Sequence, residues 1–483
     1  MTFAFHASDW ILLAPELFLT AMGLLLLGLS VALGKTKEEF LAFLAALSVG
    51  VTGALVAFVA TRPERATPIL GGAFVVDNFA LFFKALVLLS LGLTVLASAR
   101  YVGAAPYPGG EYYALLLFAG VGMLFMASGN NLISIYVALE LMALSSYVLA
   151  GYFKAEPKST EAALKYFILG AFSSGVLLYG LSLVYGAGGV MGLPELAKLL
   201  ASASRSNLLM LGILLILAGL LFKIAAVPFH VWTPDVYEGS PTPVTAFFSV
   251  GPKVAAYAIL ARIFYVAFAK FHADWGFVVA LVSAATMVLG NVAALQQSNV
   301  KRMLAYSSIA NAGYALLGVL GFRTEWGLWG ILIYLLAYTF MNFGAFTLII
   351  LLESRGYAGE SVSDFNGLAK RSMPAAVVML LFLLSLAGIP PTAGFIGKYY
   401  LFTAAMKAGY AWLAILAVVM SAVSLFYYFR IAAAMFFTEG SPAELKSSYA
   451  LSAVIAVCAA GTLVIGVVPQ PFLEVLKSCV LGR

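Results

Sequence analysis

The chain has 483 residues, of which 63% are hydrophobic and only 10% are charged, with a mean hydropathy of +1.02. A soluble domain carries about 25% charged residues, so this composition excludes a soluble globular enzyme and indicates an all-α, multispanning membrane protein. A net charge of +6 spread over loops does not indicate nucleic-acid binding. The two cysteines and three histidines lack metal-ligand spacing, and no glycine-rich phosphate loop is present, so we expect no metal or cofactor in this chain.

A helix needs about 20 apolar residues to cross a membrane. Fourteen stretches meet this requirement, and short loops separate them, so the sequence predicts one membrane domain over 1–483. The predicted spans are 10–33, 40–60, 74–98, 112–127, 131–153, 160–186, 207–228, 243–269, 275–296, 301–321, 327–352, 373–404, 411–437 and 448–470.

Prolines interrupt two of these spans. The seventh contains LFKIAAVPFHVWTPDVYEGSPTP, and the twelfth, which is too long for one straight crossing, contains LSLAGIPPTAGFIGKYYLF. Proline breaks a helix, and freed backbone at membrane depth is tolerated only inside protein or beside water. Broken helices at corresponding positions of two halves are typical of inverted-repeat transporters. The alternative is a coincidence of two proline kinks.

The two breaks lie five spans apart, and because five is odd, the second copy would enter the membrane in the opposite direction. We therefore expect inverted five-helix repeats of spans 4–8 and 9–13. The predicted parts are N-terminal helices 1–3 (1–110), the first repeat (111–270), the second repeat (271–437) and helix 14 (438–483).

The distribution of basic residues predicts the orientation. Loops after odd-numbered spans hold eleven Lys and Arg residues, and the opposite side holds nine. The positive-inside rule then places both termini on the outer side of the cell membrane.

Charged side chains inside the predicted spans are the strongest indication of function. Glu140 lies nine residues after the start of its span, roughly 13 Å deep at about 1.5 Å per residue. Lys223 and Lys253 are similarly deep, and Lys398 follows the second break. A charge at the bilayer centre costs roughly 2.5–3.5 kcal/mol, and such residues usually mark ion or proton pathways. Buried lysine can release its proton, whereas arginine cannot. The alternative interpretation is a set of structural ion pairs.

Three further cations allow more ordinary explanations. Lys165 is shallower, and Glu161 one turn before it could form an exposed i,i+4 pair. Lys84 has Asp77 two turns before it, and Arg262 is expected to be an interfacial anchor or a paired residue. These three residues are therefore weaker candidates than the deep charges.

His230 lies seven residues after Lys223 and would share its face if the helix continued. Imidazole titrates near neutral pH and can pass protons through either nitrogen. A lone histidine beside a helix break can also serve as a hydrogen-bonding group at a helix end. Small polar residues could hold water or serve as helix-packing contacts; they are Tyr136, Ser145, Ser146, Ser173, Ser174, Ser307 and Ser308.

Four segments resemble the antiporter-like membrane subunits of respiratory complex I, the NADH–quinone oxidoreductase. They are KYFILGAFSSGVLLYGLSLVYG (165–186), VPFHVWTPDVYEGSPTPVTAFFSVGPKVAAYAILAR (227–262), NVKRMLAYSSIANAGYALLG (299–318) and LAGIPPTAGFIGKYYLF (386–402). The resemblance covers essentially the whole chain and is strongest to the N type. Lys398 stands where the M type would have glutamate, and the chain ends soon after span 14, without the lateral helix of the L type.

The resemblance implies fourteen helices, inverted repeats, and proton translocation driven by quinone reduction elsewhere in the complex. It makes Glu140 and Lys223 the controlling pair of one half-channel, with Lys165 beside them. Lys253 becomes the central lysine and Lys398 the terminal lysine of the other half-channel. His230 would lie between Lys223 and Lys253.

One departure from the family pattern concerns the tenth span. Many relatives have a histidine where this chain has Asn311. Because an amide can form hydrogen bonds but does not take up a proton, a relay through that position must use water here.

The resemblance also implies partners: other membrane subunits of the complex, including adjacent antiporter-like and small K- and J-type subunits, the peripheral redox arm indirectly, and inner-membrane lipids. FMN, iron–sulfur clusters and quinone are expected on partner subunits. Two alternatives remain open at this point. The chain could belong to a multisubunit cation/proton antiporter, or it could be a non-pumping structural spacer.

Overall fold

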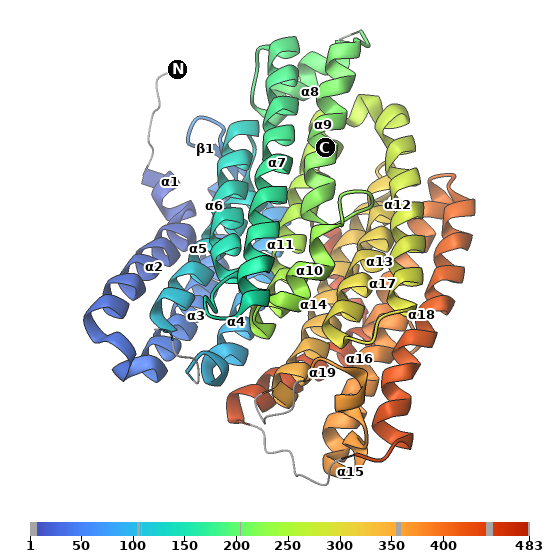
Figure 1. The fold of residues 1–483 in the computed structure, drawn as a ribbon. Coiled ribbons are helices and arrows are strands. Elements are labelled where there is room, and N and C mark those ends of the chain that lie inside the picture. The colour runs from blue at the N-terminus through green and yellow to red at the C-terminus, as the bar shows by residue number, and fades with distance from the viewer. Residues whose placement is uncertain are drawn as a thin grey trace.

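The computed structural model is a bundle of roughly aligned helices and describes residues 7–103, 107, 109–202, 204–353, 359–440 and 448–481 (Figure 1). The helices are α1 (Ala7–Leu12), α2 (Ala14–Leu33), α3 (Glu38–Ala60), α4 (Asn78–Gly103), α5 (Gly109–Ser128), α6 (Leu132–Ala150), α7 (Pro157–Gly188), α8 (Leu193–Ser202), α9 (Asn207–Lys223), α10 (Trp232–Gly239), α11 (Thr242–Arg262), α12 (His272–Leu295), α13 (Val300–Leu320), α14 (Glu325–Glu353), α15 (Leu368–Arg371), α16 (Met373–Ala387), α17 (Ala393–Lys407), α18 (Ala411–Phe437), α19 (Tyr449–Val467) and α20 (Gln470–Lys477). Two short strands, β1 (Pro68–Ile69) and β2 (Phe74–Val75), pair antiparallel.

The helix lengths confirm the predicted all-α membrane fold. Twelve helices in the described residues are long and apolar enough to cross a membrane, and the shorter apolar helices α9 and α16 begin the seventh and twelfth predicted spans. The three most buried spans are α11 with its continuation to residue 267, α13 and α14. These helices therefore form the centre of the bundle, where a charged side chain has no access to surrounding lipid.

Both predicted interruptions are present. The helix α9 ends at Lys223, Ala225 has a φ of 63°, and regular helix resumes only at Trp232. The helix α16 ends at Ala387, and Gly388, with a φ of 87°, turns the chain towards α17. Glycine suits this left-handed position because it has no Cβ. The backbone directly after α9 is buried, as irregular backbone at membrane depth requires.

Two local features were not predicted. The sequence predicts no helix between the spans that end at 186 and begin at 207, but this segment contains α8, whose buried Leu193, Leu196 and Leu200 form an apolar stripe. The third span begins at Asn78 rather than 74, because Phe74 and Val75 belong to the β1–β2 hairpin. Both elements are too short for a search for spans of about 20 residues to detect.

Equivalent helices of the proposed repeats pack in the same order. The helix α6 packs against α5 and α7, and α7 packs against α9. The helix α13 likewise packs against α12 and α14, and α14 packs against α16, the first half of the second broken span. This correspondence supports our proposal of repeats over spans 4–8 and 9–13.

The two ends of the described chain lie at the same end of the bundle. Leu12 and Leu13 pack with Ile69 and Val76, just before α4, and Asn78 donates a hydrogen bond to the Ser478 carbonyl at 3.1 Å. This arrangement agrees with an even number of crossings. Which end faces outward stays a prediction, and three of the basic residues counted for it, Arg355, Lys446 and Arg483, lie outside the described residues.

Candidate proton-transfer site

Lys223 lies where the first broken helix ends. It is the last residue of α9, and only 5% of it is exposed. Its Nζ is 3.4 Å from the Tyr147 hydroxyl of α6 and 3.4 Å from Ser174 Oγ of α7. The ammonium therefore faces two hydroxyl groups rather than a carboxylate.

Glu140 lies on α6, two turns before Tyr147, and therefore on the same face of that helix. It is close enough to Lys223 for an electrostatic interaction, but no ion pair joins the two among the described residues. Its buried Oε1 has no hydrogen-bond partner there either. Buried carboxylate oxygens usually accept a hydrogen bond, so we expect a water molecule or a mobile donor to contact this oxygen.

Lys253 occupies the centre of the bundle. It follows Pro252 inside α11, and 3% of it is exposed. Its Nζ donates to the Ser308 carbonyl of α13 at 2.9 Å and also to Ser308 Oγ. The Tyr338 hydroxyl donates to the same Ser308 Oγ at 2.8 Å. Lys253 thus joins a chain of hydroxyl groups that leads to α14.

Lys398 lies beside the second break, on α17, and is also 3% exposed. Its Nζ donates to the Leu386 carbonyl at 2.9 Å, to the Ala387 carbonyl at 3.1 Å and to Ser421 Oγ at 2.6 Å. The two carbonyls end α16, where the helix dipole is negative. The break therefore creates the acceptors that hold this lysine.

Hydroxyl and amide groups occupy the space between Lys253 and Lys398. Asn311 accepts a hydrogen bond from the Tyr334 hydroxyl at 2.7 Å and donates to Ser307 Oγ at 3.3 Å. Nearby, Asn291 Nδ2 is 3.1 Å from the Tyr314 hydroxyl, and the Tyr314 ring centroid is 4.6 Å from Lys398 Nζ. The amide at position 311 is thus held by two hydroxyl neighbours, Tyr334 and Ser307.

His230 lies in the irregular segment between α9 and α10 and is half-buried. The helical spacing considered for Lys223 and His230 does not apply, because α9 ends at Lys223. The Nδ1 atom of His230 is buried and has no hydrogen-bond partner among the described residues. The backbone nearby is fixed by a hydrogen bond from Val227 N to Thr286 Oγ1 of α12 at 3.0 Å.

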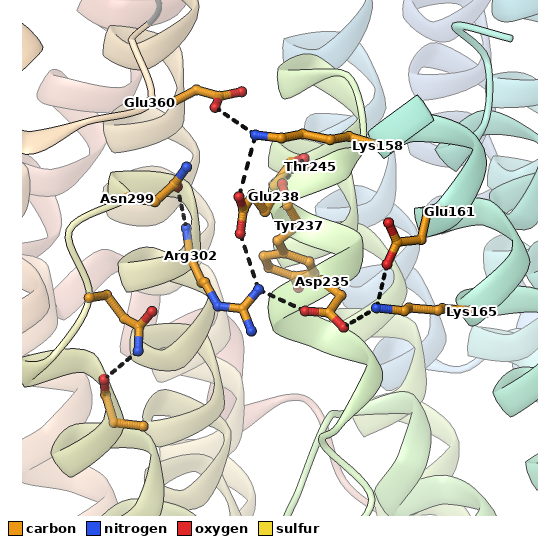
Figure 2. A network of polar contacts seen from close by, with 12 residues as sticks. Lys158, Glu161, Lys165, Asp235, Tyr237, Glu238, Thr245, Asn299, Arg302 and Glu360 are labelled. Carbon is orange, nitrogen blue, oxygen red and sulfur yellow. Dashed lines mark hydrogen bonds and ion pairs between the residues drawn. The ribbon is translucent and has the colours of Figure 1, made fainter. Parts of the chain in front are cut away.

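Lys165 lies in a different, partly exposed group (Figure 2). Its Nζ is 2.7 Å from Glu161 and 2.7 Å from Asp235 of α10, and 41% of its side chain is exposed. The i,i+4 pair considered from the sequence is therefore present. Asp235 also contacts Arg302 of α13, so Lys165 belongs to an ion-pair network rather than to the buried lysines.

Two ion pairs with buried cations were not identified from the sequence. Lys84 of α4 contacts Glu16 of α2 at 2.6 Å, and their side chains are 1% and 0% exposed. Asp77, considered as the partner of Lys84, instead accepts two hydrogen bonds from Arg262 at 2.8 and 2.9 Å. Arg262 is thus a paired residue, as expected. The only indication in the sequence was that Glu16 is a carboxylate near the start of α2, and it could have been considered as a partner for Lys84.

The arrangement is suited to proton transfer. Lys223, Lys253 and Lys398 are buried beside hydroxyl and carbonyl groups, and no carboxylate pairs with them among the described residues. A buried ammonium without a counter-ion is costly, and lysine can relieve this cost by releasing its proton. The described residues contain no group of His, Cys, Asp and Glu side chains that could hold a metal ion.

Comparison with known proteins identifies the family. Residues 129–424 match the family described as NADH:quinone oxidoreductase/Mrp antiporter, transmembrane. The chain is 45% identical to NADH-quinone oxidoreductase subunit N of Trichlorobacter lovleyi over 96% of both chains. The chain belongs to the subunit N family of NADH-quinone oxidoreductase.

Solved structures show the same fold. The subunit N family member described here matches a chain of respiratory complex I from Thermus thermophilus with a TM-score of 0.81 and 32% identity, covering 96% of this chain and 100% of that chain. It also matches a chain of the Mrp complex from Dietzia with a TM-score of 0.82 and 27% identity, covering 96% of both chains. The fold alone therefore does not separate the two assemblies, whereas the sequence identity favours subunit N.

Proposed function

We propose that this chain translocates protons as the antiporter-like subunit N of NADH:quinone oxidoreductase, driven by quinone reduction elsewhere in the complex. The observation that carries the proposal is the set of three buried lysines, Lys223, Lys253 and Lys398, in the centre of a subunit N fold. Lys223 ends the first broken helix, and the amine of Lys398 reaches the carbonyls that end α16, so both lie where a break provides polar groups inside the membrane.

The proposed mechanism is electrostatic. A charge that arrives beside Glu140 weakens the interaction of this carboxylate with Lys223. Lys223 then becomes more costly to keep charged, and its proton moves towards Lys253 and Lys398. Hydroxyl groups such as those of Ser308 and Tyr338 line the route, and water carries the proton past Asn311. His230, with its unpartnered Nδ1, is proposed as a relay near Lys223.

Lys165 has a separate role in this proposal. Its salt bridge to Asp235 ties it to α10, in a partly exposed group apart from the buried lysines. It therefore acts on the half-channel of Lys223 through the position of α10 rather than by carrying the transferred proton.

The proposal assigns the redox chemistry to partner subunits. FMN, iron–sulfur clusters and quinone would be held by those subunits, and neighbouring antiporter-like and small K- and J-type subunits would adjoin this chain in the inner membrane. Both termini would face the outer side. The second candidate is a subunit of a cation/proton antiporter, which the similarity to the Mrp complex of Dietzia favours.

Purification of the intact complex through a tag on this chain separates these candidates. We expect FMN- and iron–sulfur-containing subunits to co-purify, with quinone reductase activity that drives proton uptake into vesicles. As a control, the tag is also attached at Lys198 of α8, an exposed residue, so that it stays away from the buried lysines. Co-purification of membrane subunits alone, without flavin or iron, would instead support the antiporter.

A further inference from the structure

The short helix α10 contacts the surroundings of both Lys223 and Lys253. Its first residue, Trp232, donates from Nε1 to the carbonyl of Phe222, the residue before Lys223, at 3.1 Å. The same indole stacks on Tyr166 of α7 with centroids 4.5 Å apart and an interplanar angle of 7°. Towards its other end, the Tyr237 ring centroid lies 5.9 Å from Lys253 Nζ, within cation–π range.

The carboxylates of α10 join the two proposed repeats. Asp235 accepts from Lys165 of α7 at 2.7 Å and from Arg302 of α13 at 2.7 Å, as Figure 2 shows. Glu238 accepts from the same Arg302 nitrogen at 3.1 Å and lies 3.5 Å from Lys158 of α7. A displacement of α10 must therefore alter contacts in both halves.

Lys158 extends this network. It lies 3.4 Å from Glu360, which follows α14 in the second half of the chain. The network therefore contains three ion pairs between the halves: Arg302 with Asp235, Arg302 with Glu238, and Lys158 with Glu360 (Figure 2).

The ion pairs of α10 are weak enough to allow this helix to move. The side chains of Lys165, Asp235 and Arg302 are each about a third exposed or more, so water competes for their charges. Ion pairs of this kind are weak and can exchange partners. The segment before α10 has no regular helix from Ile224 to Val231, so it can accommodate a shift of α10 relative to α9.

We propose that α10 mechanically couples the half-channel of Lys223 to that of Lys253 and Lys398, and that Asp235 is the positioning residue of this link. This inference rests on the proposed proton-translocating function. When the charge on Lys223 changes, the end of α9 moves Trp232, and the bridge from Asp235 to Arg302 transmits the shift to α13. The backbone of α13 also holds Lys253, through the Ser308 carbonyl.

The test uses Asp235→Asn in the intact complex, reconstituted in lipid vesicles. One measurement is the ratio of protons translocated to NADH oxidised, and the other is hydrogen–deuterium exchange of amides in 232–239. We expect a lower ratio with retained electron transfer. We also expect roughly two- to five-fold faster exchange in α10, the change that about 0.5–1 kcal/mol produces when a partly exposed ion pair is lost.

Three further variants separate coupling from a general structural effect. Glu161→Gln removes the other partner of Lys165 but leaves the bridge to α13, so both readouts should match the unmodified complex. Asp235→Glu keeps the carboxylate and should restore most of the ratio. Arg302→Gln removes the same bridge from the side of α13, together with the contact to Glu238, and should lower the ratio at least as much; it replaces Asp235→Asn if that variant does not assemble.

The inference is overturned if Asp235→Asn and Glu161→Gln give the same proton ratio and the same exchange rates. Lys223→Ala, measured in the same vesicles, shows whether the proposed function itself fails. Normal pumping in Lys223→Ala would contradict the proposed function itself. Loss of pumping there, with a normal Asp235→Asn, would contradict only the role of α10.

Discussion

Replacement of Lys223 by alanine is expected to abolish or sharply reduce proton pumping while the complex still assembles. Lys223 is buried at the end of α9 and is the lysine that interacts electrostatically with Glu140. Without its amine, the proposed route loses the group that releases the proton towards Lys253. The measurement is proton uptake into vesicles at a matched rate of NADH oxidation.

Two variants show whether the proton or only the positive charge of Lys223 matters. Lys223→Arg keeps a cation at this position, but guanidinium does not release its proton in proteins. We therefore expect it to lose pumping as Lys223→Ala does. Lys198→Ala changes an exposed lysine of α8 and should pump normally. Near-normal pumping by an assembled Lys223→Ala complex would remove Lys223 from the route.

Lys84→Met is expected to lower stability by about 3–5 kcal/mol, because it leaves the carboxylate of Glu16 buried without its partner. Neither the Glu16 carboxylate nor the Lys84 amine has a hydrogen bond to a further described residue, so nothing else there compensates the carboxylate. The measurement is unfolding of the purified chain in mixed micelles with increasing denaturing detergent.

The matched control for this pair is the double variant Glu16→Leu/Lys84→Met, which contains no buried charge or unpaired polar group at the contact. It should recover most of the lost stability, since replacing both members of a buried ion pair by apolar residues of similar size is often close to neutral. A single Lys84→Met variant as stable as the unmodified chain would show that the pair contributes little to holding α2 against α4.

Hydropathy and proline placement were sufficient to predict the crossings and both broken helices. The spans are long enough for about 20 apolar residues to identify them, and Pro228 and Pro390 mark positions where helical hydrogen bonds cannot continue. The helix α8 and the β1–β2 hairpin could not be found in this way because they are short.

The partners of the charged residues could not be predicted in the same way. Lys253 meets Ser308, and Lys84 meets Glu16, through contacts between helices that are distant in sequence. Local spacing suggested Asp77 for Lys84, but Asp77 pairs with Arg262 across the α4–α11 interface. For His230, the spacing argument required a continuous helix, and the interruption after Lys223 removed that condition.

For residues near the helix breaks, the sequence likewise predicted the position but not the contacts. The sequence indicated that Lys398 follows a helix break, but only the fold shows that the final carbonyls of α16 accept its hydrogen bonds. Asp235 stands in the proline-rich segment after the first break, yet its importance depends on Arg302 of α13. Periodicity indicates which residues are buried, whereas the function of a buried charge depends on the helices packed around it.

The most direct test of the proposed route is a density map of the assembled complex that resolves ordered water. We predict water molecules that connect Glu140 to Lys223, Lys223 to Lys253 and Lys253 to Lys398, including water beside Asn311. Dry apolar packing between these groups, with each lysine enclosed by its protein contacts alone, would contradict proton conduction through this subunit.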